Sequence, residues 1–171
     1  MPGDHALSGK RRSYETGHRP KFLVIIDKTP ECARAIHFAS RRVARTGATM
    51  IMLAIVDPPD NFEWIGVGEA MIEEARAEAQ KRLDAAARDA RSAAGVEPQQ
   101  VIRVGDRAGA ITALINEDED ISFLVLAAGT SKEGPGPLVS TLAGKASSTF
   151  PVPIVIVPGS LSDEEIDALA G

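Results

Sequence analysis

Five short apolar runs divide the chain, and each is followed directly by Asp, Gly or Pro. The runs are continuous rather than alternating, which is typical of strands buried on both faces of a sheet. Gly and Pro, like Asp, favour turns, so each run is expected to end where these residues appear. The pattern therefore predicts five β-strands, at residues 22–26, 49–56, 100–104, 122–128 and 153–157.

The segments between these runs carry apolar residues at helical spacing and predict a helix between each pair of strands. The first helix is expected to have Thr29 as its N-cap and Pro30 at its first position, and to end at Gly47. The second is predicted over 68–94 and the third over 108–116. A short helix rich in small residues is expected before the last strand.

This alternation of strands and helices predicts the α/β class, with a five-stranded parallel sheet, right-handed crossovers and helices on both faces. In such sheets, ligands bind at the carboxyl ends of the strands. Asp27, Asp57, the pair Gly105-Asp106 and Gly129 all follow directly after predicted strands. We therefore expect a binding cleft at this edge of the sheet.

Composition places the chain among single-domain globular proteins with a core of small aliphatic residues. The 171 residues suffice for one domain, and aromatic residues make up only 4%, so Ala, Val, Ile and Leu must build the core. No apolar stretch is long enough for a transmembrane helix, and the N-terminus lacks a hydrophobic leader, so neither membrane insertion nor export is expected. The single cysteine, Cys32, excludes an internal disulfide framework and fits a reducing cytoplasm.

Charge is distributed unevenly along the chain, and together with the predicted elements it suggests three parts. Residues 1–21 carry a net charge of +3, so the remainder carries −8 of the total of −5. We interpret 1–20 as a disordered basic arm, 21–158 as the α/β domain, and 159–171 as an acidic tail or a short helix started by a Ser162–Glu165 capping box. The arm has one aromatic residue, Tyr14, and the body is acidic, so nucleic-acid binding is not expected.

Several residues of types that often carry chemistry have ordinary structural explanations. Cys32 on an apolar helix face is expected to be a small core residue, and Asp106 to cap a helix. The acidic run 117–120 is interpreted as a solvated turn. The histidines form no metal-binding pattern and no nucleophile–base pair is visible, so we predict no catalytic residue, no metal ligand and at most weak ATP hydrolysis.

A glycine-rich loop between the last two strands is the main candidate for binding chemistry. A strand, a glycine loop and a helix together present backbone N–H groups and a helix N-terminus to a phosphate. The loop contains Gly129, Gly134, Gly136 and Gly144, with Lys145 directly after. It is not a Walker A motif, because Ala146 stands where that motif requires Ser or Thr. The prolines on both sides of Gly136 also remove two N–H groups that a phosphate could use.

Three sequence segments resemble the universal stress protein family across residues 21–158. They are FLVIID at 22–27, VGD at 104–106, and PVPIVIVP at 151–158 after the glycine-rich link. The resemblance implies an adenine nucleotide alpha hydrolase-like, Rossmann-like fold with strand order 3-2-1-4-5. Nucleotide-binding members carry G-x2-G-x9-G-[S/T]. Here Gly134 and Gly144 keep the nine-residue interval. Gly129 and Gly134, however, are separated by four residues where the motif has two, and Lys145 stands where the motif has Ser or Thr.

The resemblance implies a small cytoplasmic stress regulator that binds ATP or AMP, with Mg²⁺ if the ligand is a triphosphate. Asp27 would contact adenine or ribose, Ile55 would pack against adenine, and the glycines would let the backbone approach ribose and phosphates. Lys145 would add a cation beside the phosphates. The residues implied to bind nucleotide are Asp27, Ile55, Gly129, Gly134, Gly136, Gly144 and Lys145.

The altered loop leaves a second function open, a dimeric interaction module that has lost nucleotide binding. The segment from Ile154 to Val157 is expected to be an edge strand, and so apolar an edge must be covered. The family often covers it by pairing with the same strand of a second subunit. A homodimer through this strand is therefore predicted with either function.

Overall fold

The computed structural model describes residues 11–58 and 65–171 and contains five strands within them. All strand pairs are parallel, and the strand order is β3-β2-β1-β4-β5. This confirms the predicted α/β fold and its order. The strands are β1 Lys21–Ile25, β2 Thr49–Val56, β3 Gln99–Val104, β4 Ile121–Ala128 and β5 Ile154–Pro158. The helices are α1 Cys32–Thr46, α2 Ile65–Ala94, α3 Arg107–Glu117, α4 Pro137–Leu142, the 3₁₀ helix η3 Lys145–Thr149 and α5 Asp163–Leu169.

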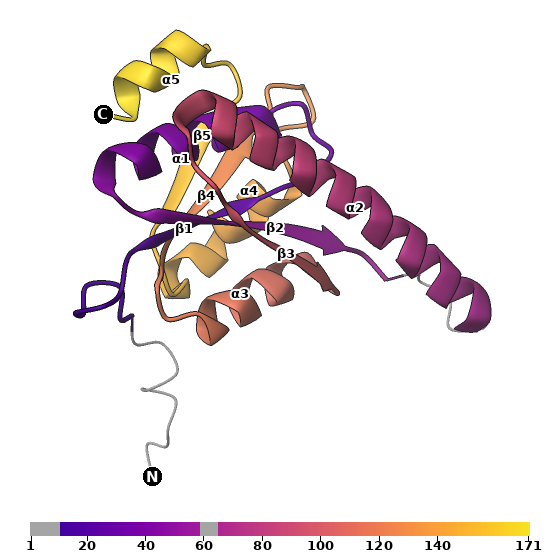
Figure 1. The fold of residues 1–171 in the computed structure, drawn as a ribbon. Coiled ribbons are helices and arrows are strands. Elements are labelled where there is room, and N and C mark those ends of the chain that lie inside the picture. Colours follow the sequence, from indigo (N-terminus) through magenta and orange to yellow (C-terminus); the bar gives the residue numbers. More distant parts are fainter. Residues whose placement is uncertain (1–10, 59–64) are drawn as a thin grey trace.

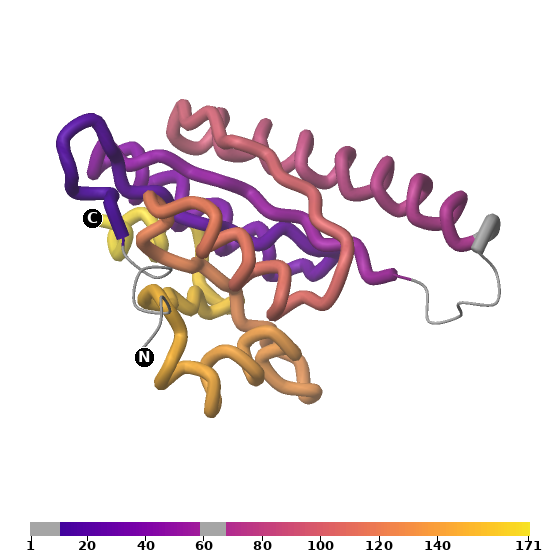
Figure 2. Tube along the Cα trace, turned by 90° about the horizontal axis from the view of Figure 1, so that it is seen from below, coloured from indigo at the N-terminus to yellow at the C-terminus, as the bar shows by residue number. Residues whose placement is uncertain are grey.

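Helices cover both faces of the sheet, as predicted (Figure 1). Successive residues of a buried strand point to opposite faces. Phe22 and Val24 of β1 therefore join the core beneath α1 and α2, whereas Leu23 and Ile25 join the core beneath α3 and α4. Figure 2 shows α2 as a long rod along one side of the sheet, with its first turns extending past the strand ends. None of the helices in the described residues is long and apolar enough to cross a membrane.

The start of α1 differs from the prediction, because Thr29 does not cap the helix. The helix begins at Cys32, and Glu31 at the N-cap makes no side-chain cap bond. Instead, the N–H and the hydroxyl of Thr29 both donate to Oδ1 of Asp27, at 2.9 and 2.6 Å. The carboxylate two residues upstream therefore accepts both donors and holds Thr29 in a local turn, where its hydroxyl donates and does not act as the accepting group of a cap. The predicted end at Gly47 is confirmed, since its φ of 73° suits glycine.

Two other predicted caps are confirmed. The carboxylate of Asp106 accepts a hydrogen bond from the Gly109 N–H at the start of α3. Ser162 and Glu165 form the reciprocal capping box of α5, so the C-terminal segment contains a short helix. This helix lies on α1, where His37 Nε2 and Asp167 Oδ1 are 2.7 Å apart.

Residues 11–20 were predicted to belong to a disordered arm, but they lie against the turn before β4. The N–H of Arg12 donates to the Glu119 carbonyl at 2.9 Å, and the side chains of His18 and Asp120 approach to 2.7 Å. Lys21 and Asp118 form an ion pair of 2.7 Å. The acidic run 117–120 is therefore a partner of the basic segment rather than only a solvated turn. Residues 1–10 lie outside the described residues.

Candidate functional site

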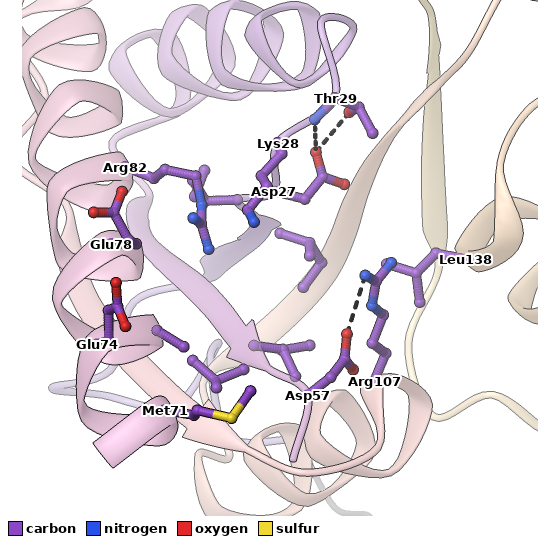
Figure 3. Close-up of a pocket in the computed structure, with 15 residues that line it drawn as sticks. Asp27, Lys28, Thr29, Asp57, Met71, Glu74, Glu78, Arg82, Arg107 and Leu138 are labelled. Carbon is purple, nitrogen blue, oxygen red and sulfur yellow. Dashed lines mark hydrogen bonds and ion pairs between the residues drawn. The ribbon is translucent and has the colours of Figure 1, made fainter. Parts of the chain in front are cut away.

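A cavity of about 490 Å³ lies at the carboxyl ends of β1 and β2, at the edge of the sheet where a cleft was expected. Ile25, Ile55 and Val56 supply the hydrophobic part of its lining, called its apolar floor here. Leu138 of α4 lies across the cavity from α2 (Figure 3). Its volume falls in the range of about 300–1,000 Å³ that is typical of small-molecule sites. The predicted site residues Asp27 and Ile55 both line it.

Asp27 combines a structural role with an exposed acceptor. Its Oδ1 accepts both donors of Thr29, which fixes the carboxylate at the end of β1. Its Oδ2 has no hydrogen-bond partner among residues 11–58 and 65–171. Because Asp27 lines the cavity, this oxygen is placed to accept hydrogen bonds from ligand hydroxyl or amino groups.

One face of α2 forms a wall of the cavity, which sequence reasoning missed. Met71, Glu74, Glu78 and Arg82 follow one another at intervals of three or four residues and all line the cavity. Met71 and Arg82 reach toward it in Figure 3. Nε of Arg82 is buried and has no hydrogen-bond partner within the described part of the chain. The helical spacing was visible in the sequence. What the sequence did not show is that this part of α2 stands over the ends of the strands.

Arg107, also missed, is the cation on the side of the cavity opposite α2. It begins α3, directly after the Gly105-Asp106 turn at the end of β3, and its Nη2 lies 3.4 Å from Oδ2 of Asp57. It also borders a smaller cavity of about 50 Å³ that reaches Gly136. The strand-end rule drew attention to Asp106. In the structure, Asp106 caps α3, and the next residue, Arg107, points toward the cavity (Figure 3).

The glycine loop makes hydrogen bonds within itself. The N–H of Gly129 donates to the Pro135 carbonyl at 3.0 Å, and the N–H of Gly134 donates to the Ser131 carbonyl at 3.1 Å. Two N–H groups expected to face a phosphate are therefore already used. Of the loop glycines, Gly136 borders the smaller cavity, whereas Gly129 and Gly134 line neither of these two cavities.

Gly144 and Lys145 lie farther along the chain, between α4 and η3, and also line neither cavity. A Cβ on Gly144 would lie 2.8 Å from the Ser140 carbonyl oxygen, so this glycine allows close backbone packing. Lys145 is exposed. The structure thus brings Asp27 and Ile55 together with Gly136 nearby, and leaves the other four predicted residues outside the cavity lining.

A carboxylate lies where the resemblance implied phosphates. A Cβ on Gly129 would meet Oε1 of Glu31 at 2.9 Å, so the Glu31 side chain lies against the loop. Glu31 also lines the smaller cavity, together with Asp27 and Arg107. Two carboxylates and one guanidinium therefore surround this space, which disfavours a ligand group that carries several negative charges.

Cys32 is a core residue, as predicted. Its thiol donates to the Ile25 carbonyl, and burial raises the pKa of the thiol to about 11. A thiol protonated at neutral pH is a poor nucleophile. No group of three or more His, Cys, Asp or Glu side chains within the described ranges is arranged to hold a metal ion.

Comparison with known families assigns the chain to one of them. The sequence model of the universal stress protein family matches residues 18–158. The chain belongs to this family. No curated protein matches the chain in sequence. The match leaves out the segment 11–17 and helix α5, both of which pack on the family domain.

Solved structures of universal stress proteins share the fold at low sequence identity. The protein UspA from Lactobacillus plantarum superposes with a TM-score of 0.68 at 16% identity, covering 81% of this chain and 97% of its own. A universal stress protein from Archaeoglobus fulgidus in complex with dAMP gives 0.58 at 16%, covering 81% and 96%. A family protein from Arabidopsis thaliana with AMP bound gives 0.53 at 15%, covering 85% and 94%.

Proposed function

We propose that this universal stress protein is a nucleotide-binding regulator that binds AMP in the cavity lined by Asp27 and Ile55. One observation carries the proposal: an apolar-floored cavity of about 490 Å³ has Asp27 on one side and Arg107 on the other. A nucleoside monophosphate has matching parts, because it combines an apolar ring, a hydroxylated sugar and one anionic group. The dAMP and AMP complexes of two structurally similar proteins support this choice.

Each part of the ligand has a counterpart in the cavity. Adenine would lie on the apolar floor beside Ile55, and a ribose hydroxyl would donate to Oδ2 of Asp27. The phosphate would accept from the guanidinium of Arg107. This guanidinium supplies a charge-assisted contact where the loop offers few free N–H groups.

A monophosphate suits the site better than a triphosphate. The N–H groups of Gly129 and Gly134 bond within the loop, and Glu31 lies against that loop. A triphosphate would have to open these bonds and approach the Glu31 carboxylate. ATP with Mg²⁺ stays a prediction that requires a rearranged loop.

We propose binding without a dedicated chemical step. Of the described residues that line the larger cavity, none is His, Ser or Cys, and Thr29 uses its hydroxyl on Asp27. A regulator would instead report nucleotide level through occupancy. A role in stress response follows from the family, and a cytoplasmic location remains an expectation from the sequence.

Calorimetric titration with AMP tests the proposal, comparing the wild-type protein with Asp27→Asn. The substitution keeps the size of the side chain but removes the charged acceptor, which is worth about tenfold in affinity. Asp84→Asn is the matched control, because Asp84 is exposed on α2 and bonds Gln80 rather than lining the cavity. Absence of binding at millimolar AMP, or equal affinities for the two variants, would refute the proposal.

We also propose that the protein forms a homodimer through β5. This strand is at the edge of the sheet, and its Ile156 side chain is 37% exposed, which favours a covering partner. Sedimentation of the wild-type protein and of Ile156→Lys tests it, with a dimer expected only for the former. A wild-type monomer at micromolar concentration would refute the pairing. A dimer that binds no nucleotide would favour the interaction module instead.

A further inference from the structure

Another cavity, of about 410 Å³ and called the second cavity below, lies at the opposite end of the sheet from the proposed AMP cavity and its small neighbour. Its walls come from residues near the start of three strands, Phe22 of β1, Phe123 of β4 and Val155 of β5. The second half of α1 lies above it, and the segment before β1 closes one side. The AMP cavity uses the carboxyl ends of the strands, so the two cavities are separate sites.

The second cavity gathers most of the aromatic side chains of the protein. Four of the seven aromatic residues in the sequence line it, namely Tyr14, Phe22, Phe38 and Phe123. The rings of Phe22 and Phe123 are 4.8 Å apart between centroids and tilted by 46°. In a core built from aliphatic residues, this concentration of rings is local and specific to the cavity.

Phe22 is buried, but the other three aromatic rings are not fully covered by the protein itself. Tyr14 is 84% exposed, and Phe38 and Phe123 are only partly buried. Exposed aromatic faces favour contact with another planar ring, by stacking or edge-to-face packing. The cavity therefore offers a surface for a flat apolar group.

The charge at the cavity rim is a single cation. Arg42 is the only charged side chain among the described residues that line it, and no Asp or Glu does so. The Nη1 atom of Arg42 donates to the Ala170 carbonyl, and the guanidinium makes no ion pair within the described part of the chain. Its remaining N–H groups are available to a carboxylate. The AMP cavity, by contrast, has four carboxylates in its lining.

We propose that this second cavity binds a small planar aromatic carboxylate, with its ring among Tyr14, Phe38 and Phe123 and its anionic group on Arg42. Ring and charge must both be present for the best fit. An apolar ring without the charge loses the contact with Arg42, and a charged aliphatic compound loses the contacts with the rings.

Calorimetric titration with 2-naphthoate tests the proposal, with 2-naphthamide as the matched neutral probe. We expect one naphthoate per chain, and an affinity about tenfold above that of the amide. Arg42→Gln should remove this difference while leaving the amide affinity unchanged. Arg45→Gln is the control, because Arg45 lies in the same helix but outside the cavity lining. Tyr14→Ala should weaken both probes severalfold, since it removes one ring.

Three outcomes would overturn this proposal. The first is no binding of 2-naphthoate at millimolar concentration to a protein with wild-type circular dichroism. The second is displacement of naphthoate by saturating AMP, which would place the probe in the other cavity. The third is naphthoate binding that disappears as the protein dimerises, which would assign the cavity to contact with a second copy.

Discussion

Replacing Arg107 by Gln should weaken AMP binding, and replacing Asp57 by Asn should strengthen it. Both effects follow from the contact between Arg107 Nη2 and Asp57 Oδ2, which at 3.4 Å is longer than the 2.7–2.9 Å typical of strong charged pairs. The two side chains are 44% and 61% exposed, so the pair contributes less than about 1 kcal/mol. A phosphate can therefore take the guanidinium from Asp57 at small cost.

The magnitudes follow from these two contacts. A hydrogen bond between Arg107 and a phosphate is worth about 1.5–3 kcal/mol, and breaking the existing pair costs about 0.5–1 kcal/mol. The net contribution is about 0.5–2.5 kcal/mol, so Arg107→Gln should lower the affinity by about 2- to 70-fold. Asp57→Asn frees the guanidinium and removes a negative charge that would repel the phosphate, so the affinity for AMP should rise by about 2- to 5-fold.

The assay is calorimetric titration with AMP at low and at high salt. Arg103→Gln is the charge-matched control, because Arg103 pairs with Glu117 at 2.7 Å and lines neither the AMP cavity nor its smaller neighbour. The control should bind AMP as the wild-type protein does, and the gain in Asp57→Asn should shrink at high salt. An unchanged affinity in Arg107→Gln, or a loss in Asp57→Asn, would refute the assignment of the phosphate to Arg107.

Three further predictions concern the loop, the cysteine and the C-terminal helix. Gly136→Ala should lower the free energy of unfolding by about 1–3 kcal/mol, because the φ of Gly136 is 109° and disfavours a side chain, and an unchanged urea midpoint would contradict this. Cys32 should react with iodoacetamide at pH 8 about 100-fold more slowly in the folded protein than in urea, because burial raises its pKa to about 11; equal rates would show that the thiol is accessible. The hydrogen bond from Arg34, and then its charge, lower the pKa of Asp163. The contact therefore stabilises the docked α5 fully at pH values above the ordinary Asp pKa of about 3.9, and this stabilisation is lost as the pH falls through the lowered pKa. An NMR titration should show this lowered pKa and its return toward the ordinary value in Arg34→Gln, and an ordinary value in both proteins would argue against the pair.

The sequence predicted the sheet because its signals are local and strong. Continuous apolar runs ending at Asp, Gly or Pro specified five buried strands, and the handedness of the crossovers limited how they could be arranged. Helix ends set by one residue, such as Gly47, were also predictable. The failure at Thr29 has a physical reason, because its hydroxyl donates to Asp27 and does not accept from a helix N–H, and these two roles cannot be ranked from sequence spacing alone.

The candidate site was predictable only where it depends on strand ends. Asp27 follows the carboxyl end of β1 and Ile55 belongs to β2, so the topology placed them at the cavity. Arg82 could not be placed in the same way, because its position depends on how far α2 extends past the sheet. The internal hydrogen bonds of the glycine loop depend on loop geometry, which glycine spacing does not fix.

The contacts made by residues 11–17 and by α5 mean that the folding unit is larger than the region shared with the family. A chain trimmed to residues 18–158 would lose the Arg11 bonds to the carbonyls that end α3, and would expose the face of α1 that α5 covers. Family boundaries mark common ancestry, whereas cooperative unfolding follows physical contact. In this protein the segment 11–17 and helix α5 therefore belong to the same folding unit as the shared domain.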